Sequence, residues 1–210
     1  MNTKKGFTLI EMLVVIGILA ILMGATIGGF SAMTAKAQRA QTQEAVSNAA
    51  TALGVLYSKL GVWPQSLFSA KKNNGYSIMD ENVAKVFARH GLMSVNATSH
   101  KDRNGRSVYT LKGSSKFGIL DPQGEKVMRR NSAATEGTSV PGGGTVKDHL
   151  LYFAVDQDGD GIVSKSEGAI VDIRATAIVW CAGRDGKLDD YAKYGRIDDV
   201  YSWQKAQEQK

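Results

Sequence analysis

An acidic segment near the C-terminus carries the side chains with the clearest chemical potential. Six positions within residues 156–167 can offer an oxygen atom to a cation: Asp156, Asp158, Asp160, Ile162 through its carbonyl, Ser164 and Glu167. Hard oxygen donors at this density suit Ca²⁺. Gly161 permits the sharp turn that such a loop needs, and we expect Ser164 to act directly or through a water. The alternative is an acidic surface turn, because Asp and Gly favour turns in any case.

The spacing of these donors matches the twelve-residue calcium loop of the EF-hand at every diagnostic place. The context differs, because an EF-hand loop follows a helix. Here the β-rich, apolar run 149–155 precedes the loop, and a similar run at 175–181 follows it. We therefore expect a calcium loop within a β-hairpin.

A second unusual carboxylate, Glu11, is the only charged residue between Phe7 and Phe30. This apolar stretch would form about 36 Å of helix, enough to cross a hydrocarbon core about 30 Å thick. A carboxylate within such a span costs roughly 2.5–3.5 kcal/mol and usually has a partner. Lys4 and Lys5 precede the span, which by the positive-inside tendency places the N-terminus in the cytoplasm.

Cleavage between Gly6 and Phe7 would supply a partner for Glu11. The new, positively charged amine of Phe7 would lie about one helical turn before the carboxylate. The same amine could instead pair with Glu11 of a neighbouring subunit and set the axial step between protomers. The helix dipole also favours a carboxylate in the first turn.

Residues 6–16, Gly-Phe-Thr-Leu-Ile-Glu-Met-Leu-Val-Val-Ile, closely resemble the type III leader of type IV pilins and pseudopilins. The resemblance implies that a prepilin peptidase cuts after Gly6 and methylates Phe7, and that Glu11 guides subunit assembly. It also implies an α+β, pilin-like fold, in which a long N-terminal helix, transmembrane in its first half, packs on a small antiparallel β-sheet. A plain signal anchor with a stray Glu is the alternative.

A second acidic loop resembles the C-terminal calcium loop of major pseudopilins. Residues 182–186, Ala-Gly-Arg-Asp-Gly, are similar to the Ala-x-x-Asp-Gly turn of that family, and a later acidic pair precedes Trp203. The resemblance implies Asp185, Asp198 and Asp199 as candidate ligands. A bound Ca²⁺ would there clamp a loop that has too few apolar residues to order itself.

The elements that must position these groups form five predicted segments. They are a leader (1–6), a transmembrane helix half (7–30), an amphipathic helix half (31–61), a variable region (62–148) and a C-terminal β-region with calcium-type loops (149–210). Apolar residues from Val46 to Leu60 recur at steps of three and four, which predicts one buried helix stripe. Gly61 and Pro64 should end this helix.

The variable region is less informative. It contains a short helix candidate at 81–90, a polar, basic turn at 101–106, a weak strand candidate at 126–130 and a loop at 131–147. No chemistry is predicted there.

Composition excludes several classes of protein. The single cysteine, Cys181, forbids an intrachain disulfide and lies in an apolar run, where a buried hydrophobe is expected. No Ser/His/Asp grouping, metal-hydrolase motif or phosphate-binding loop is apparent, so we do not expect an enzyme. The net charge of +6 comes from Lys and Arg scattered among acids, which predicts a solvated surface and no nucleic-acid partner.

Together these features predict a structural subunit of a pseudopilus, the fibre of a type II secretion system that drives protein export. The expected partners are further copies of the chain in a helical filament, other pseudopilins, the prepilin peptidase, an inner-membrane assembly platform and membrane lipid. The expected location is the bacterial inner membrane, single-pass, with a periplasmic C-terminal domain, and then a periplasmic or surface fibre.

Two alternatives stay open. The first is a type IV pilin for adhesion or DNA uptake, although such pilins commonly carry a C-terminal disulfide loop that one cysteine cannot form. The second is a membrane-anchored calcium-binding module that never polymerises.

Overall fold

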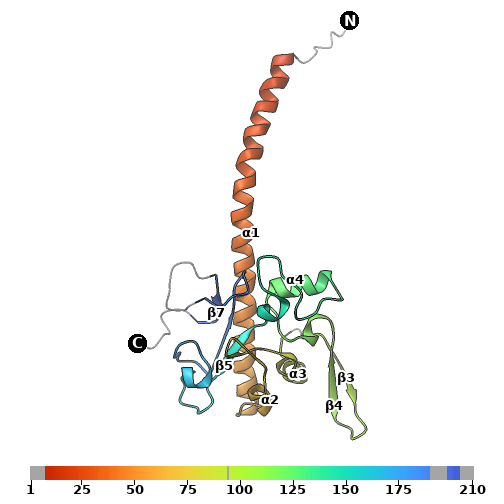
Figure 1. Ribbon diagram of the computed structural model, residues 1–210, viewed down its shortest axis with the longest axis vertical. Coiled ribbons are helices and arrows are strands. Elements are labelled where there is room, and N and C mark those ends of the chain that lie inside the picture. The colour runs from red at the N-terminus through yellow and green to blue at the C-terminus, as the bar shows by residue number, and fades with distance from the viewer. Residues whose placement is uncertain (1–7, 94, 190–197, 204–210) are drawn as a thin grey trace. The chain divides into compact units, whose positions relative to one another are not determined.

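The computed structural model describes residues 8–93, 95–189 and 198–203, apart from the side chains of residues 25–32. The chain forms two compact units, residues 1–40 and residues 41–210. Helix α1 (Leu9–Leu60) contributes its first part to unit 1 and its remainder to unit 2 (Figure 1). The long N-terminal helix expected from the sequence is therefore confirmed.

Among its described residues, unit 1 presents apolar side chains without a core of its own. The large apolar side chains from Leu9 to Met23 are all exposed, Leu9 by 83% and Val15 by 45%. A continuous apolar surface of this kind requires a cover from outside the chain. Within the part of the chain that the structure describes, no helix has an apolar stretch long enough to cross a membrane.

The part of α1 in unit 2 buries one apolar stripe, as its periodicity predicted. Val46, Ala49, Leu53 and Leu56 are fully buried. The helix ends as predicted at Gly61, which adopts the left-handed conformation (φ +70°) and donates its N–H to the Tyr57 carbonyl at 2.8 Å.

The stripe packs against a three-stranded antiparallel sheet of order β5-β6-β7, formed by Tyr152–Val155, Ala177–Cys181 and Val200–Tyr201. Side chains alternate between its faces, as a period of two requires. Phe153 and Val179 join the cluster that includes the α1 stripe, whereas Tyr152 and Trp180 join a second cluster. The sheet is thus buried on both sides, and its first two strands fall within the runs predicted from the sequence.

Cys181 lies at the end of β6 and is fully buried. Burial raises the pKa of its thiol, so the side chain stays protonated and behaves as a small hydrophobe. This agrees with its place in an apolar run.

Short elements surround the sheet, most of them in the variable region. The helices are α2 (Gln65–Phe68), α3 (Glu81–His90) and α4 (Pro122–Arg130), with 3₁₀ turns at Gly113–Lys116, Val146–His149 and Lys165–Glu167. Two antiparallel hairpins pair β1 (Lys72–Asn73) with β2 (Tyr76–Ser77), and β3 (Ala97–Lys101) with β4 (Ser107–Leu111). Helix α3 has the predicted bounds.

The strand expected at 126–130 is wrong, because these residues form the second half of α4. Asp121 is the helix N-cap, and its Oδ1 accepts hydrogen bonds from the N–H groups of Gln123 (2.9 Å) and Gly124 (2.8 Å). Pro122 then occupies the first helical position, where its missing N–H does no harm. Asp121 and Pro122 therefore start a helix.

Candidate functional site

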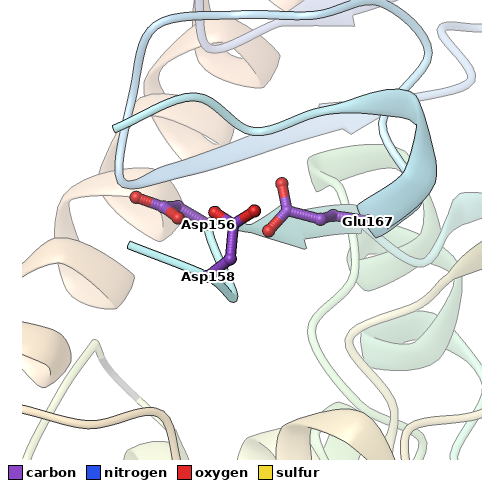
Figure 2. Close-up of side chains that lie close together, drawn as sticks. All are labelled: Asp156, Asp158 and Glu167. Carbon is purple, nitrogen blue, oxygen red and sulfur yellow. The ribbon is translucent and has the colours of Figure 1, made fainter. Parts of the chain in front are cut away.

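The first acidic loop lies in the connection 156–176 between the antiparallel strands β5 and β6. Its place within a β-hairpin, and not between two helices, agrees with the sequence analysis. The side chains of Asp156, Asp158 and Glu167 face one another (Figure 2). One carboxylate oxygen from each of the three lies within 4.8 Å of the others.

The loop backbone holds two of these carboxylates in place. Asp156 accepts hydrogen bonds from the N–H of Gly159 (2.6 Å) and from the N–H of Gly161 (2.9 Å). Both glycines have positive φ (+78° and +82°), which other residues adopt only with strain. Glu167 reaches back across the loop to the N–H of Ser164 at 2.8 Å and also accepts the N–H of Gln157. The three carboxylates therefore converge although their like charges repel.

The other predicted donors occupy different positions. Asp160 accepts the N–H of Ile162 at 2.7 Å and is not part of the three-carboxylate group. Ser164 contacts the group through Glu167, whose Oε2 lies 3.0 Å from its hydroxyl. The structure thus brings three of the six predicted donors together and arranges the rest around the same turn.

A second carboxylate group involves Asp189, Asp198 and Asp199, again with one oxygen of each within 4.8 Å of the others. Asp198 accepts the N–H groups of Arg184 (2.6 Å) and Asp185 (3.2 Å). The Asp185 side chain is instead bonded to the N–H of Lys187 at 2.8 Å and does not join the group. Asp189 takes its place, although only Asp185, Asp198 and Asp199 were named as ligands from the sequence.

Asp199 is the most unusual member of this group, because it is only 2% exposed. Its Oδ2 accepts the N–H of Asp189 (3.0 Å) and the Tyr201 hydroxyl (3.1 Å), whereas its Oδ1 has no hydrogen-bond partner among the described residues. Burial raises the pKa of Asp199 to about 7. A buried carboxylate oxygen without a partner fits a cation ligand, since a cation would offset the loss of hydration.

A buried histidine that was not predicted as a site residue holds the loop that packs against the second acidic loop. His149 is fully buried, with Nδ1 2.8 Å from Asp121 Oδ2 and Nε2 3.0 Å from the Gly143 carbonyl oxygen. Because both nitrogens face acceptors, both must carry a proton, and the ring is an imidazolium. Burial lowers its pKa, but the bond and charge of Asp121, helped by Gly143 and Asp148, outweigh burial and raise it.

The loop that His149 holds packs against the second acidic loop. A Cβ atom on Gly143 would lie 2.4 Å from the Asp185 carbonyl oxygen, and one on Gly144 would lie 3.1 Å from the Gly186 Cα. Only glycine permits this close approach of two backbones. The glycine run at 142–144, which the sequence suggested was only a loop, is therefore a packing surface.

Glu11 has a partner within its own helix that the sequence analysis did not consider. Its Oε2 accepts the N–H of Thr8 at 2.8 Å and the Thr8 hydroxyl at 2.7 Å, while its own N–H bonds the Thr8 Oγ1 at 3.3 Å. This reciprocal arrangement is a capping box, which satisfies two N–H groups at the start of a helix. Gly6 and Phe7, the predicted processing residues, lie outside the described residues.

The fold and the N-terminal motif together define a class of protein. A long N-terminal helix that begins at a Thr8–Glu11 capping box, followed by a small antiparallel sheet packed on its second half, is a pilin-like fold.

Comparison with known proteins agrees with this class. Residues 1–27 match the prokaryotic N-terminal methylation motif. The type IV major pilin protein PilE of Neisseria gonorrhoeae is 32% identical over 112 residues, which cover 51% of this chain and 67% of that protein. Fimbrial proteins of Neisseria meningitidis serogroups A and B are each 30% identical over 105 residues, which cover 50% of this chain and 62% of each relative. No solved structure gives a significant match.

This chain belongs to the type IV pilin and pseudopilin family. Members of this family are structural filament subunits and not enzymes.

Proposed function

We propose that the chain is a fibre subunit of a pseudopilus that drives protein export by type II secretion. The observation that carries the proposal is the apolar surface of α1 from Leu9 to Met23, which lies within the N-terminal methylation motif and which unit 1 leaves exposed. In the proposed cycle, residues 7–30 first anchor the chain in the inner membrane, with Lys4 and Lys5 on the cytoplasmic side. The same surface then packs against neighbouring copies in a helical filament.

The proposed partners follow from this cycle. A prepilin peptidase would remove residues 1–6, an assembly platform in the inner membrane would add subunits, and other pseudopilins would join the same fibre. Unit 2 would then project into the periplasm or from the cell surface.

Processing is the first expected result. In membranes of cells that contain a prepilin peptidase, the chain should begin at Phe7 and carry one added methyl group. The intact mass and the N-terminal sequence measure this directly. A chain that still begins at Met1, or one that is cut after residue 24 and released, would contradict the proposal and favour the non-polymerising module.

A type IV pilus is the second candidate, because the relatives named above are a major pilin and fimbrial proteins. The two candidates differ in what deletion of the gene would abolish. Loss of secreted protein with intact surface pili supports the pseudopilus, whereas loss of surface pili with normal secretion supports the pilus.

We further propose that one or both acidic loops bind Ca²⁺. The donors are all oxygen atoms, which suits this ion, and the unpartnered Oδ1 of Asp199 fits a cation. In the first loop Asp156, Asp158 and Glu167 would hold the ion, with Asp160, Ile162 and Ser164 beside them. A bound ion would neutralise the converging carboxylates and hold each loop against the sheet.

Calcium should therefore raise the stability of the protein. At a free concentration of about one hundred times Kd, we expect a gain of about 2.7 kcal/mol in the free energy of unfolding. Calorimetric titration of the full-length protein in non-ionic detergent should give the number of sites. Asp158→Asn should remove the site in the first loop, and Asp198→Asn the site in the second.

Asp199→Asn gives the sharpest test of the second loop. Without calcium it should stabilise the protein, because it removes a buried charge with an unpartnered oxygen. In the presence of calcium, the variant should lack the increase in the free energy of unfolding that binding at the second site provides. Glu44→Gln, at an exposed carboxylate on α1, is the matched control and should change neither value. Equal unfolding curves in calcium and in chelator for the unmodified protein would exclude both sites.

A further inference from the structure

The β3–β4 hairpin of unit 2 uses few of its side chains to build the core. From Thr98 to Val108 every residue is exposed except Asp102, which is half-buried. Leu111 at the base of the hairpin is buried and anchors it. Figure 1 shows the two strands extending away from the other elements of the unit. Since the side chains from Thr98 to Val108 are almost all exposed, they are available to something outside the chain.

This hairpin and the residues directly after it also carry the chain's excess of positive charge. Residues 96–116 contain five Lys or Arg residues and one Asp. The rest of the chain after Gly6 contains 19 basic and 19 acidic residues and is neutral overall. The expectation of no nucleic-acid partner assumed that basic residues are scattered evenly among acids. The excess is instead confined to residues 96–116, with Lys101, Arg103 and Arg106 on the hairpin and Lys112 and Lys116 directly after it.

The basic side chains at the tip form no salt bridge among the described residues. The Asp102 carboxylate is directed into its own turn, where Oδ1 accepts the N–H groups of Asn104 (2.9 Å) and Arg106 (2.7 Å). Among the described residues, the ion pairs do not include Lys101, Arg103 or Arg106. Lys101 Nζ lies 2.9 Å from the Ser107 hydroxyl, across the ribbon. Three cations therefore gather at the tip and repel one another unless an anion binds.

We propose that the β3–β4 hairpin is a docking surface for double-stranded DNA, with Lys101, Arg103 and Arg106 on the phosphate backbone. A two-stranded β-ribbon has the dimensions that the major groove admits. Exposed hydroxyl groups of Thr98, Ser99 and Thr110 along the strands are of the kind that donate to phosphate oxygens.

The chemistry of the ribbon favours duplex DNA over other anionic partners. The tip, Asp-Arg-Asn-Gly-Arg at 102–106, lacks the aromatic or aliphatic side chains with which surface-bound segments enter a membrane interface. Tyr109 is the only Phe, Tyr or Trp residue of the ribbon and is half-buried, so single strands would find little surface for base stacking.

The number of cations sets the expected salt dependence. Three phosphate contacts give a slope of about −2.7 in the logarithm of the association constant against the logarithm of salt concentration. A fourfold rise in salt would then weaken binding roughly 40-fold. A non-specific dissociation constant in the range of about 10⁻⁶ to 10⁻⁴ M is expected for an interface of this kind.

Fluorescence anisotropy with a labelled duplex of about 20 base pairs tests the proposal on the full-length chain in non-ionic detergent. The tip variant carries Lys101→Gln, Arg103→Gln and Arg106→Gln. The control variant carries Lys126→Gln, Arg130→Gln and Arg174→Gln, which remove the same charge from exposed positions elsewhere. We expect the tip variant to bind at least about tenfold more weakly at about 50 mM salt, with a slope reduced by nearly 3, and the control to change little.

Two results would overturn the proposal. They are no duplex binding by the unmodified chain at low salt, and equal losses in the tip and control variants. All six positions are exposed, so neither variant should unfold. The assay needs no filament, so its outcome is independent of whether the chain assembles into a fibre.

Discussion

Replacing Glu11 by Ala should abolish fibre assembly while leaving unit 2 folded and the leader still removed. The capping box shows that the Glu11 carboxylate lies at the very start of α1, within reach of backbone N–H groups. After cleavage, the nearest cation would be an amine at residue 7 of the same or a neighbouring subunit. The loss of about 1.4 kcal/mol at one subunit contact lowers an association constant tenfold, and a filament repeats that contact at every subunit.

Cross-linking measures this effect. Cysteines introduced along residues 9–23 should give a ladder of oligomers in the parent chain and only monomer with Glu11→Ala. Cys181 is buried and should not interfere. Thr8→Val is the matched control, because it removes the hydroxyl partner of Glu11 but keeps the charge. If the assembly role depends on the charge, Thr8→Val should retain most of the ladder. A full ladder with Glu11→Ala would refute this role.

Replacing His149 by Ala should destabilise unit 2 by about 3–5 kcal/mol, because it leaves the Asp121 carboxylate buried without its cation. This is a large part of the 5–15 kcal/mol that stabilises a typical domain. Asp121 would still cap α4 through Oδ1, so the stability that is lost is that of the ion pair and of the hydrogen bond to Gly143. Denaturant unfolding, followed through the fluorescence of the buried residues Trp180 and Trp203, measures it.

The same pair predicts a dependence on pH. The folded-state pKa of His149 is raised, so the imidazolium stabilises the fold fully below the unfolded-state pKa of about 6.5. This contribution is lost as the pH rises from that value through the folded-state pKa. In the double variant Asp121→Asn with His149→Gln both charges are absent, so the decline due to this pair should disappear. A parent chain whose stability does not fall in this range would show that His149 is neutral.

Local sequence pattern was enough for the elements whose determinants lie close together in the chain. The three-and-four spacing of apolar residues determined the buried stripe of α1, and Gly61 determined its end. The β-rich, apolar runs 149–155 and 175–181 located β5 and β6. The strand candidate at 126–130 was wrong. Asp121 caps the helix that forms there by accepting its first N–H groups, and Pro122 fits the first helical position.

The two acidic loops differ in how much of their structure the local sequence could predict. Asp156, Asp158 and Glu167 could be identified from spacing, because a twelve-residue turn is a local structure. The partners of Asp199 could not, because Asp189 and Asp199 meet only after β7 pairs with β6.

The sequence by itself determined the class of protein, because the prepilin motif, the apolar helix and the first acidic loop are each continuous segments. Only the tertiary structure decided which charges become buried and which stay in solvent. It placed His149 between Asp121 and Gly143, brought the glycine run 142–144 against the second acidic loop, and left the β3–β4 ribbon uncovered. The physical reason is that burial depends on contacts between residues far apart in the chain, and neither composition nor periodicity reports those contacts.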